Sequence, residues 1–369
     1  MVKNSLWFIL LLIFNGAYSQ ENHLKLMVGT YTNECESDGI YVYDFDLIRS
    51  SASLYNQTEG VVNPSFISIS DDAKIVYAVN ENGVESSVSA YKYEPISSSL
   101  TLINKQKGAG DDPCHLINDE NNVLVANYSS GSISVFKKSK TGGLNVASQT
   151  IKHVGRSKNP DRQASPHVHQ VQFSPDHKYV LATDLGTDKI YIYNYNATAD
   201  KEILTIKDSV SVRSGGGPRH LTFSPNGKFA YLLQELDGGL IVYKYHDGFL
   251  QKLEETQVVN DDFKGEISAA DIHFSPDGNF LYATNRGDAN DITVFIVQKD
   301  GRLNYKASYS SGGNGPRNFV IDPTGAYLLV ANQYSDVITI FKRDMVSGRL
   351  TLLSEKIEVC SPVCLVFVP

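Results

Sequence analysis

The chain has 369 residues, of which 41% are hydrophobic and 20% are charged, and 33 Lys and Arg against 41 Asp and Glu give a formal net charge of −8. These values exclude an intrinsically disordered chain, which would be poorer in apolar residues and richer in charge. The acidic balance, without any block of Lys and Arg, also argues against nucleic-acid binding as the main function. The 21 Tyr, 16 Phe and 28 Gly against three Met favour β structure.

The N-terminal segment has the pattern of a secretory signal. A nine-residue apolar run at residues 6–14 follows Lys3 and precedes the small-residue sequence GAYS. The run is too short for a membrane-spanning helix, which needs about 20 apolar residues. It therefore predicts a signal peptide over residues 1–19. Since no second apolar run suggests a membrane anchor, we expect an exported protein, periplasmic or secreted.

Four cysteines remain after this segment. Cys35, Cys114, Cys360 and Cys364 permit up to two disulfides among three pairings in an exported protein. Free buried thiols are the alternative, and the sequence leaves the choice open. The CSPVC spacing of the last two has no second pair or His cluster nearby, so it does not predict a zinc site.

One motif recurs along the rest of the chain. Its clearest copy is GPRHLTFSPNGKFAYLL at residues 217–233. Similar copies begin near residues 63, 112, 167, 269 and 315, and a truncated copy ends the chain. Seven copies at a spacing of about 50 residues indicate a closed ring or a solenoid of repeated units.

Each copy predicts four short strands. In the clearest copy we expect them at 219–224, 229–235, 240–245 and 250–258, where apolar and polar residues alternate. Asn-Gly, Asp-Gly and Gly-Gly pairs supply the turns between them. Four antiparallel strands per repeat form the blade of a β-propeller, which is an all-β fold. No helical periodicity separates the strands, and this argues against an α/β fold.

The two ends of the chain favour closure of the ring. The last copy provides one strand, and the N-terminal part provides three unpaired strands at 24–31, 39–46 and about 53–58. Together these strands complete a seventh blade and remove the open edges that a linear stack would leave. We therefore predict a single seven-bladed β-propeller domain over residues 20–369.

Two aligned positions of the repeat should face one mouth of the central channel. The first column, at the start of each inner strand, holds Ser65, Cys114, His169, Arg219, Ala270, Arg317 and Val363. The second column, at the end of the following strand, holds Tyr31, Glu81, Tyr128, Leu185, Glu235, Arg286 and Gln333. A purely structural ring would fill both columns with similar small or apolar residues. The candidate site residues are instead His169, Arg219, Glu235 and Arg286, with Arg317, Glu81, Tyr128, His115, His167 and His220 beside them.

This set of residues predicts a positively charged pocket in an acidic protein. Guanidinium groups match the oxygens of a carboxylate, a phosphate or a developing oxyanion. Buried charges are costly unless they are paired or used, so their concentration at one place indicates function. The alternative is a structural network that plugs the channel through Arg219–Glu235 and Arg286–Glu81 pairs.

Three further patterns are weaker signals. The SGGG sequence at 214–217 could cradle a phosphate, but it opens a strand and not a helix, so a tight turn between blades is the favoured interpretation. His167 and His169 have metal-ligand spacing on a strand, yet carboxylates do not cluster with them, and we predict no metal. No G-x-S-x-G motif supports a covalent serine mechanism.

The copies resemble the lactonase family of seven-bladed propellers, through SPHVHQVQFSPDHKYVLATDLGTDKIYIY, GGPRHLTFSPNGKFAYLLQE and ATNRGDANDITVF, among others. That family includes propeller-type 6-phosphogluconolactonase and the fungal carboxy-muconate lactonizing enzyme. In the family, a His, two Arg and a Glu in the central cleft are held responsible for the chemistry. The matching motifs here contain His169, Arg219, Glu235 and Arg286, with His167 as the other candidate for the His.

The resemblance implies hydrolysis of a sugar-type lactone, a small-molecule substrate, without a metal or other cofactor. Arg219 and Arg286 would hold the anionic group and the oxyanion. Glu235 or His169 would take the proton of water, and the His would protonate the leaving ring oxygen. A non-catalytic propeller that binds a ligand or a protein is one alternative, and a lactonizing enzyme is another. We expect a monomer that binds neither nucleic acid nor a membrane.

Overall fold

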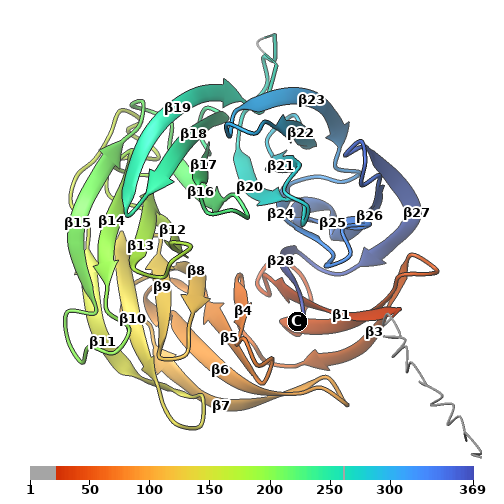
Figure 1. The fold of residues 1–369 in the computed structure, drawn as a ribbon. Coiled ribbons are helices and arrows are strands. Elements are labelled where there is room, and N and C mark those ends of the chain that lie inside the picture. Colours follow the sequence, from red (N-terminus) through yellow and green to blue (C-terminus); the bar gives the residue numbers. More distant parts are fainter. Residues whose placement is uncertain (1–21, 261) are drawn as a thin grey trace, which may run out of the picture.

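The computed structural model describes residues 22–260 and 262–369, so the predicted signal peptide over residues 1–19 lies outside the described residues. The described chain forms 28 strands and two short 3-10 helices, Gly83–Glu85 and Gln333–Ser335. The strands make seven sheets of four antiparallel strands, arranged as blades around a central axis (Figure 1). The prediction of an all-β, seven-bladed propeller is confirmed. No helix in these two ranges is long and apolar enough to cross a membrane.

Six blades are continuous in the chain, and each begins with its innermost strand. Blade 1 consists of β4 (Ile67–Ile69), β5 (Ile75–Asn80), β6 (Ser87–Glu94) and β7 (Ser99–Lys107), and blade 2 consists of β8 (Pro113–Asn118), β9 (Asn122–Asn127), β10 (Ser132–Lys138) and β11 (Leu144–Lys152). Blade 3 consists of β12 (Val168–Phe173), β13 (Tyr179–Asp184), β14 (Lys189–Tyr195) and β15 (Leu204–Ser211), and blade 4 consists of β16 (Pro218–Phe223), β17 (Phe229–Gln234), β18 (Gly239–His246) and β19 (Phe249–Gln257). Blade 5 consists of β20 (Ala269–Phe274), β21 (Phe280–Asn285), β22 (Asp291–Val297) and β23 (Leu303–Ser310), and blade 6 consists of β24 (Pro316–Ile321), β25 (Tyr327–Asn332), β26 (Val337–Arg343) and β27 (Leu350–Glu358). The chain therefore returns from the rim to the axis at the start of every blade.

The seventh blade joins the two ends of the chain. Its inner strand is β28 (Pro362–Phe367), followed outward by β1 (His23–Thr30), β2 (Ile40–Asp46) and β3 (Ser51–Thr58). Strands β28 and β1 are antiparallel, with Val28 opposite Leu365. The predicted closure by one C-terminal and three N-terminal strands is confirmed, and it leaves the ring without an open end.

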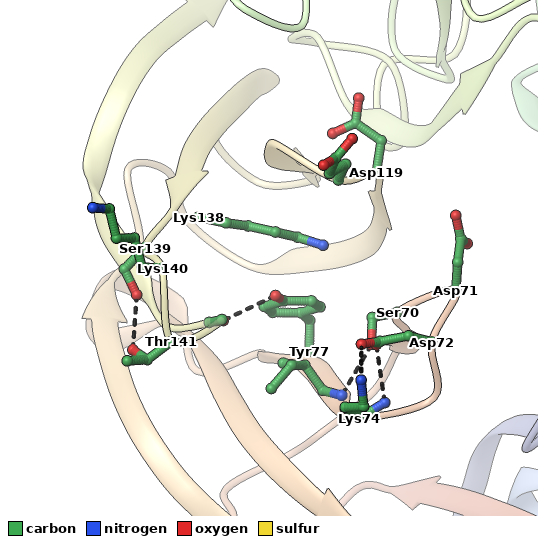
Figure 2. A pocket seen from close by; sticks show the side chains of 13 residues that line it. Ser70, Asp71, Asp72, Lys74, Tyr77, Asp119, Lys138, Ser139, Lys140 and Thr141 are labelled. Atoms are coloured by element: carbon green, nitrogen blue, oxygen red, sulfur yellow. Dashed lines mark hydrogen bonds and ion pairs between the residues drawn. The ribbon is translucent and has the colours of Figure 1, made fainter.

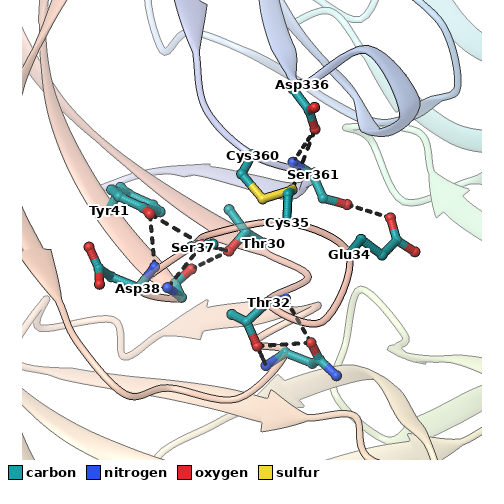
Figure 3. The surroundings of a disulfide bond; sticks show 12 residues. Thr30, Thr32, Glu34, Cys35, Ser37, Asp38, Tyr41, Asp336, Cys360 and Ser361 are labelled. Carbon is teal, nitrogen blue, oxygen red and sulfur yellow. Dashed lines mark hydrogen bonds between the residues drawn. A yellow bond between two sulfur atoms is a disulfide. The ribbon is translucent and has the colours of Figure 1, made fainter.

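A disulfide between Cys35 and Cys360 ties the same two ends together (Figure 3). Cys35 lies in the loop after β1, and Cys360 lies just before β28. Cys114 and Cys364 are free thiols in the interior. The structure thus selects one disulfide and two buried thiols from the possibilities that the sequence left open.

The serine of the repeated SPD and SPN sequences forms the turn between the first two strands of a blade. In blade 4 the Ser224 hydroxyl donates to Asn226 Oδ1 at 2.8 Å and accepts the N–H of Phe229 at 3.0 Å. Ser174 and Ser275 make the corresponding contacts in blades 3 and 5. Because these turns lie at the far end of the inner strands, they direct the two aligned columns to the other end.

The core consists of hydrophobic clusters between neighbouring blades, and each of the seven interfaces of the described ring contains one. Tyrosine side chains stabilise these interfaces in two ways, through packing of the ring and through a hydrogen bond from the hydroxyl. Tyr77, Tyr231 and Tyr282 are buried, and their hydroxyls donate to a glycine carbonyl of the next blade at 2.7–2.9 Å. The excess of Tyr and Gly therefore follows from blade packing, which holds the inner strands in place.

Candidate active site

The first-column residues lie at β-bulges in five blades. The pairing register shifts around the second residue of the inner strand, and these residues are Cys114, His169, Arg219, Ala270 and Arg317. A bulge inserts one extra residue, bends the strand and re-aims a side chain. All of them except Arg317 are buried. The inner strands thus turn this column toward the channel, as the repeat predicts.

The second-column residues directly follow the second strand of each blade. In all seven blades of the described ring, the backbone N–H of this residue donates to the carbonyl oxygen two residues before the first-column residue. In blade 4, Glu235 N lies 2.7 Å from Gly217 O, and in blade 5, Arg286 N lies 3.0 Å from Ser268 O. This repeated hydrogen bond brings both columns to the same channel mouth.

Glu235 is the centre of the charged cluster at this mouth, and only 3% of it is exposed. Its Oε1 accepts a hydrogen bond from Arg162 Nη2 at 2.6 Å. Its Oε2 lies 2.9 Å from Arg219 Nε and 3.1 Å from Arg286 Nη2. Nε2 of His169 is 3.7 Å from the same oxygen. The four predicted catalytic residues are therefore brought together from blades 3, 4 and 5.

Direct guanidinium contacts control the charge of Glu235. Burial alone would raise the pKa of this carboxyl, but the three guanidinium groups, Arg286 first, lower it to about 2. Burial and the repulsion from Arg286 lower the pKa of Arg219 to about 10, which leaves it charged at neutral pH. Glu235 is thus an ionised anchor with both oxygens occupied, and it is a poor proton acceptor.

His169 is an uncharged imidazole beside this anchor. Burial and the nearby Arg219 charge hold the pKa of His169 well below its usual value. Its ring stands edge to face with Tyr128, with centroids 5.4 Å apart, and its Nδ1 lies 3.9 Å from Cys114 Sγ. A neutral imidazole can accept a proton at neutral pH. His169 therefore has the protonation state that a general base requires.

A second charged chain crosses blades 6, 7 and 1. Arg317 Nη2 donates to the Tyr31 hydroxyl at 2.9 Å, and this hydroxyl donates to Glu81 Oε2 at 2.8 Å. The expected alternative pairing of Arg286 with Glu81 is wrong, because Arg286 in blade 5 lies next to Glu235 of blade 4 and bonds to it instead. Glu81 belongs to the other side of the ring.

Arg162 belongs to the site, although the repeat pattern did not indicate it. It lies in the connection between β11 and β12, with 42% of its side chain exposed, and it also donates to the Tyr128 hydroxyl at 3.2 Å. Arg162 stands in neither column, so the alignment of the copies could not assign it. A signal was present in the spacing, since Cys114 and His169 are 55 positions apart, the largest interval between first-column residues.

The remaining predicted residues line the channel wall beside the charged cluster. His167 stacks on Tyr128 with centroids 4.5 Å apart, and its Nδ1 lies 3.0 Å from the Tyr128 carbonyl oxygen. His115 is buried and stands edge to face with His220, with centroids 5.7 Å apart. His220 Nδ1 lies 2.8 Å from Asp271 Oδ1. The three histidines lie beside the mouth without joining the guanidinium contacts.

The SGGG sequence forms a tight turn between blades 3 and 4, as predicted. Asp188 accepts the N–H of Gly215 at 2.6 Å and that of Gly217 at 2.8 Å. The N–H of Gly216 donates to the Arg213 carbonyl. Because the protein itself uses all three N–H groups, the turn does not cradle a phosphate.

His167 and His169 do not belong to a cluster with metal-ligand geometry. Within residues 22–260 and 262–369, the one group of three ligand atoms close enough to hold an ion is Cys35, Asp336 and Cys360. The two sulfur atoms of that group form the disulfide.

A separate cavity of about 580 Å³ lies at the opposite end of the strands, between blades 1 and 2 (Figure 2). It is lined by the turns that follow β4, β8 and β10. Lys138 extends into it between Asp119 and Tyr77, with Nζ 2.7 Å from Asn118 Oδ1. None of the predicted site residues lines this cavity. Its acidic surroundings also suit an anionic ligand less well than the mouth with the arginines.

Fold and site together define a seven-bladed propeller with a cluster of arginines around a buried glutamate at one channel mouth. The chain belongs to the lactonase family, because the family model described as "Lactonase, 7-bladed beta-propeller" matches residues 25–367. The family predicted from the repeats is therefore confirmed.

Individual relatives are similar over nearly the whole chain. A 6-phosphogluconolactonase of Bacillus subtilis is 36% identical over 345 residues, which cover 92% of this chain and 97% of the relative. A 6-phosphogluconolactonase of Formosa agariphila is 34% identical, over 90% of this chain and 96% of the relative. The solved structure of a periplasmic gluconolactonase of Pseudomonas aeruginosa matches with a TM-score of 0.90 at 36% identity, over 94% of this chain and 99% of that one.

Proposed function

We propose that the protein is a lactone hydrolase that opens a sugar lactone, phosphorylated or plain, to the aldonic acid. The observation that supports this most is the buried Glu235 that anchors three guanidinium groups beside a neutral imidazole. The similar proteins are named 6-phosphogluconolactonase and gluconolactonase, and both names denote the opening of a sugar lactone.

The arginines bind the negative charge that develops in this reaction. Nη2 of Arg219 and Nη1 of Arg286 donate to no atom of the described residues, so both are free to meet the carbonyl oxygen as it becomes an oxyanion. Glu235 holds the two guanidinium groups in position beforehand. Donors that are already oriented need no rearrangement at the moment of reaction, and losing one typically lowers the rate by about 10²–10³.

We assign the two proton transfers of the reaction, from water and to the ring oxygen, to histidine. Water loses a proton as it adds to the carbonyl carbon, and the ring oxygen gains one when the C–O bond breaks. Glu235 is not available for this task, because guanidinium groups hold both of its carboxylate oxygens. His169 is neutral and can take up the proton and return it to the ring oxygen, a contribution of about 10²–10⁴ in rate.

The first experiment measures lactone hydrolysis by the purified protein in a pH-stat, above the spontaneous rate. The panel holds phosphorylated and plain aldonolactones. We expect turnover of at least one of them, and we expect His169→Gln to fold normally and lose about 10²–10⁴ of kcat. His177→Gln is the matched control, because this exposed His lies in the turn at the opposite end of the same blade.

Two outcomes would contradict these assignments. Flat traces for the wild-type protein across the panel would favour a propeller that binds without catalysis. Wild-type turnover in His169→Gln would remove His169 from the mechanism while leaving the activity itself in place.

We also infer that the enzyme is exported and acts as a monomer. The signal-like pattern of residues 1–19 and the Cys35–Cys360 disulfide support export, because disulfides persist in oxidising compartments. The likeness to a periplasmic gluconolactonase agrees with this location. Fractionation of cells that express the full chain, with sedimentation of the purified protein, tests both inferences.

A further inference from the structure

Two consecutive side chains of β16 point to the same neighbouring blade. Arg219 Nη1 donates to the carbonyl oxygen of Ala270, and the next residue, His220, contacts Asp271 on the same strand, β20. In a regular strand consecutive side chains face opposite sides. The bulge at Arg219 removes this alternation. His220 therefore follows Arg219 into the channel wall beneath the arginine cluster.

Asp271 determines which nitrogen of His220 bears the hydrogen. Nδ1 lies 2.8 Å from Asp271 Oδ1, and an ionised carboxylate only accepts hydrogen bonds, so Nδ1 is the protonated nitrogen. The lone pair is then on Nε2, which has no hydrogen-bond partner among the described residues. The His220 ring stands edge to face with His169, with centroids 5.5 Å apart. An unprotonated nitrogen thus lies beside the imidazole already assigned to catalysis.

We propose that His220, oriented by Asp271, is the base that takes the proton of the attacking water, while His169 protonates the leaving ring oxygen. This rests on the proposed function and refines it, because the first of the two proton transfers given there to His169 passes to His220, and His169 keeps the second. Water gives its proton to His220 Nε2 as its oxygen bonds to the carbonyl carbon. The proton passes to His169 and then to the ring oxygen as the C–O bond breaks. Both imidazoles end neutral, so protons and electrons balance.

The groups around His220 keep its ring uncharged, which is the state in which Nε2 can accept a proton. It faces Asp271 and Arg219, and the neutral rings of His115 and His169 stand next to it. Burial and the Arg219 charge lower the pKa of His220 to about 4, so the ring is uncharged at neutral pH. Burial would raise the pKa of Asp271, but its histidine partners hold it well below the usual range. The carboxylate therefore stays ionised and orients the ring as a positioning residue.

The contacts of Asp271 predict that Asp271→Asn changes the tautomer of His220 without leaving a cavity, because the two side chains have nearly the same shape. Its Oδ2 accepts from Asn318 Nδ2 at 2.5 Å and lies near Phe319 N at 3.3 Å. The Asn318 amide cannot turn over freely, because its oxygen accepts the N–H of Leu365 at 2.7 Å. Oδ2 faces three donors, because His273 Nε2 also lies 2.9 Å from it, whereas Oδ1 faces His220 and one backbone donor, Ile272 N at 2.9 Å. In Asp271→Asn, the new carbonyl oxygen should therefore stay on the side with more donors. The new NH2 group then faces His220 Nδ1, which must become an acceptor and leave the hydrogen on Nε2.

The test compares kcat and the His220 tautomer in wild type, Asp271→Asn, His220→Gln and His273→Gln. Nitrogen NMR of protein labelled at histidine reports which ring nitrogen is protonated. We expect Asp271→Asn to switch the tautomer and, like His220→Gln, to lower kcat by about 10²–10⁴. His273→Gln is the matched control, because His273 Nε2 lies 2.9 Å from Asp271 Oδ2 and Gln can replace it as a donor. This control should keep the tautomer and a rate close to wild type.

The outcomes separate the inference from the function on which it rests. A wild-type protein without lactone hydrolysis overturns the proposed function, and the assignment of His220 with it. An active wild type whose Asp271→Asn variant shows the switched tautomer and an unchanged kcat overturns the assignment alone. Where Asp271→Asn does not fold, His220→Gln decides, since it leaves the contacts of Asp271 with β24 intact, and an unchanged kcat there overturns the assignment as well.

Discussion

Both ends of the channel strands contain cationic side chains together with carboxylates, but cations are in excess at one end and carboxylates at the other. At the mouth, four arginines face two carboxylates, and these residues are Arg162, Arg219, Arg286, Arg317, Glu235 and Glu81. At the opposite end, the cavity holds four carboxylates and three lysines, namely Asp71, Asp72, Asp119, Glu120, Lys74, Lys138 and Lys140. A formal net charge of −8 therefore says little about the sign of the charge at either place.

The two ends also differ in how strongly opposite charges act on one another. Glu235 touches its guanidinium partners in a buried place, and they lower its pKa to about 2 against the effect of burial. Burial of Lys138 outweighs the attraction of four carboxylates, and the pKa of this lysine falls to about 8. Asp71 and Asp72 are exposed, so water screens them. Direct contact away from water, and not the number of charges, sets the electrostatics of the site.

Among the changes that test this comparison of the two ends, removal of the Glu235 charge should have the largest effect. We expect Glu235→Gln to lower kcat/KM by about 10²–10³, because the guanidinium groups lose their anchor. The same change should lower the free energy of unfolding by about 3–5 kcal/mol, the usual cost of breaking a buried ion pair. Glu255→Gln is the control, since this glutamate is 22% exposed at its side chain and pairs with Lys252 on the surface. Equal stability and activity in the two variants would contradict the comparison.

A smaller effect should follow from opening the disulfide at the same end. We expect Cys35→Ser with Cys360→Ser to unfold with about 2–5 kcal/mol less free energy than wild type, because the link closes a very long loop. Denaturant unfolding measures this loss, and reduction of the wild type should produce the same curve. Coincident curves for oxidised and reduced wild type would show that β1 and β28 hold the ring without the link.

The smallest effect should come from the opposite end. Since the folded-state pKa of Lys138 is about 8 and its ordinary value is 10.5, the unfolded chain binds more protons between these pH values. The free energy of unfolding should therefore rise with pH across this window, by about 1–2 kcal/mol. Lys138→Met should abolish the rise, be more stable than wild type below pH 8 and hydrolyse lactone at the wild-type rate. A loss of activity in this variant would show that residues at the end opposite the arginine cluster contribute to the function.

Much of the candidate site could be predicted because the repeat encodes position. Glu235 and Arg286 stand at the same place in consecutive copies, and the backbone bond from the second column repeats in every blade. What the repeat could not provide is the pairing across the axis. Arg286 meets Glu235 and not Glu81, and Arg162 enters from the longest of the connections between consecutive blades.

By itself, the sequence determined the number of blades, their closure by the two ends and the end of the channel at which the charged columns lie. These properties depend on hydrogen bonds and turns that recur within each copy of about 50 residues. Only the tertiary structure decided which charges of different blades touch, which cysteines pair and which nitrogen of His220 is free. Those contacts join segments that are far apart in the chain, and they depend on side-chain directions across blade interfaces that no single copy specifies.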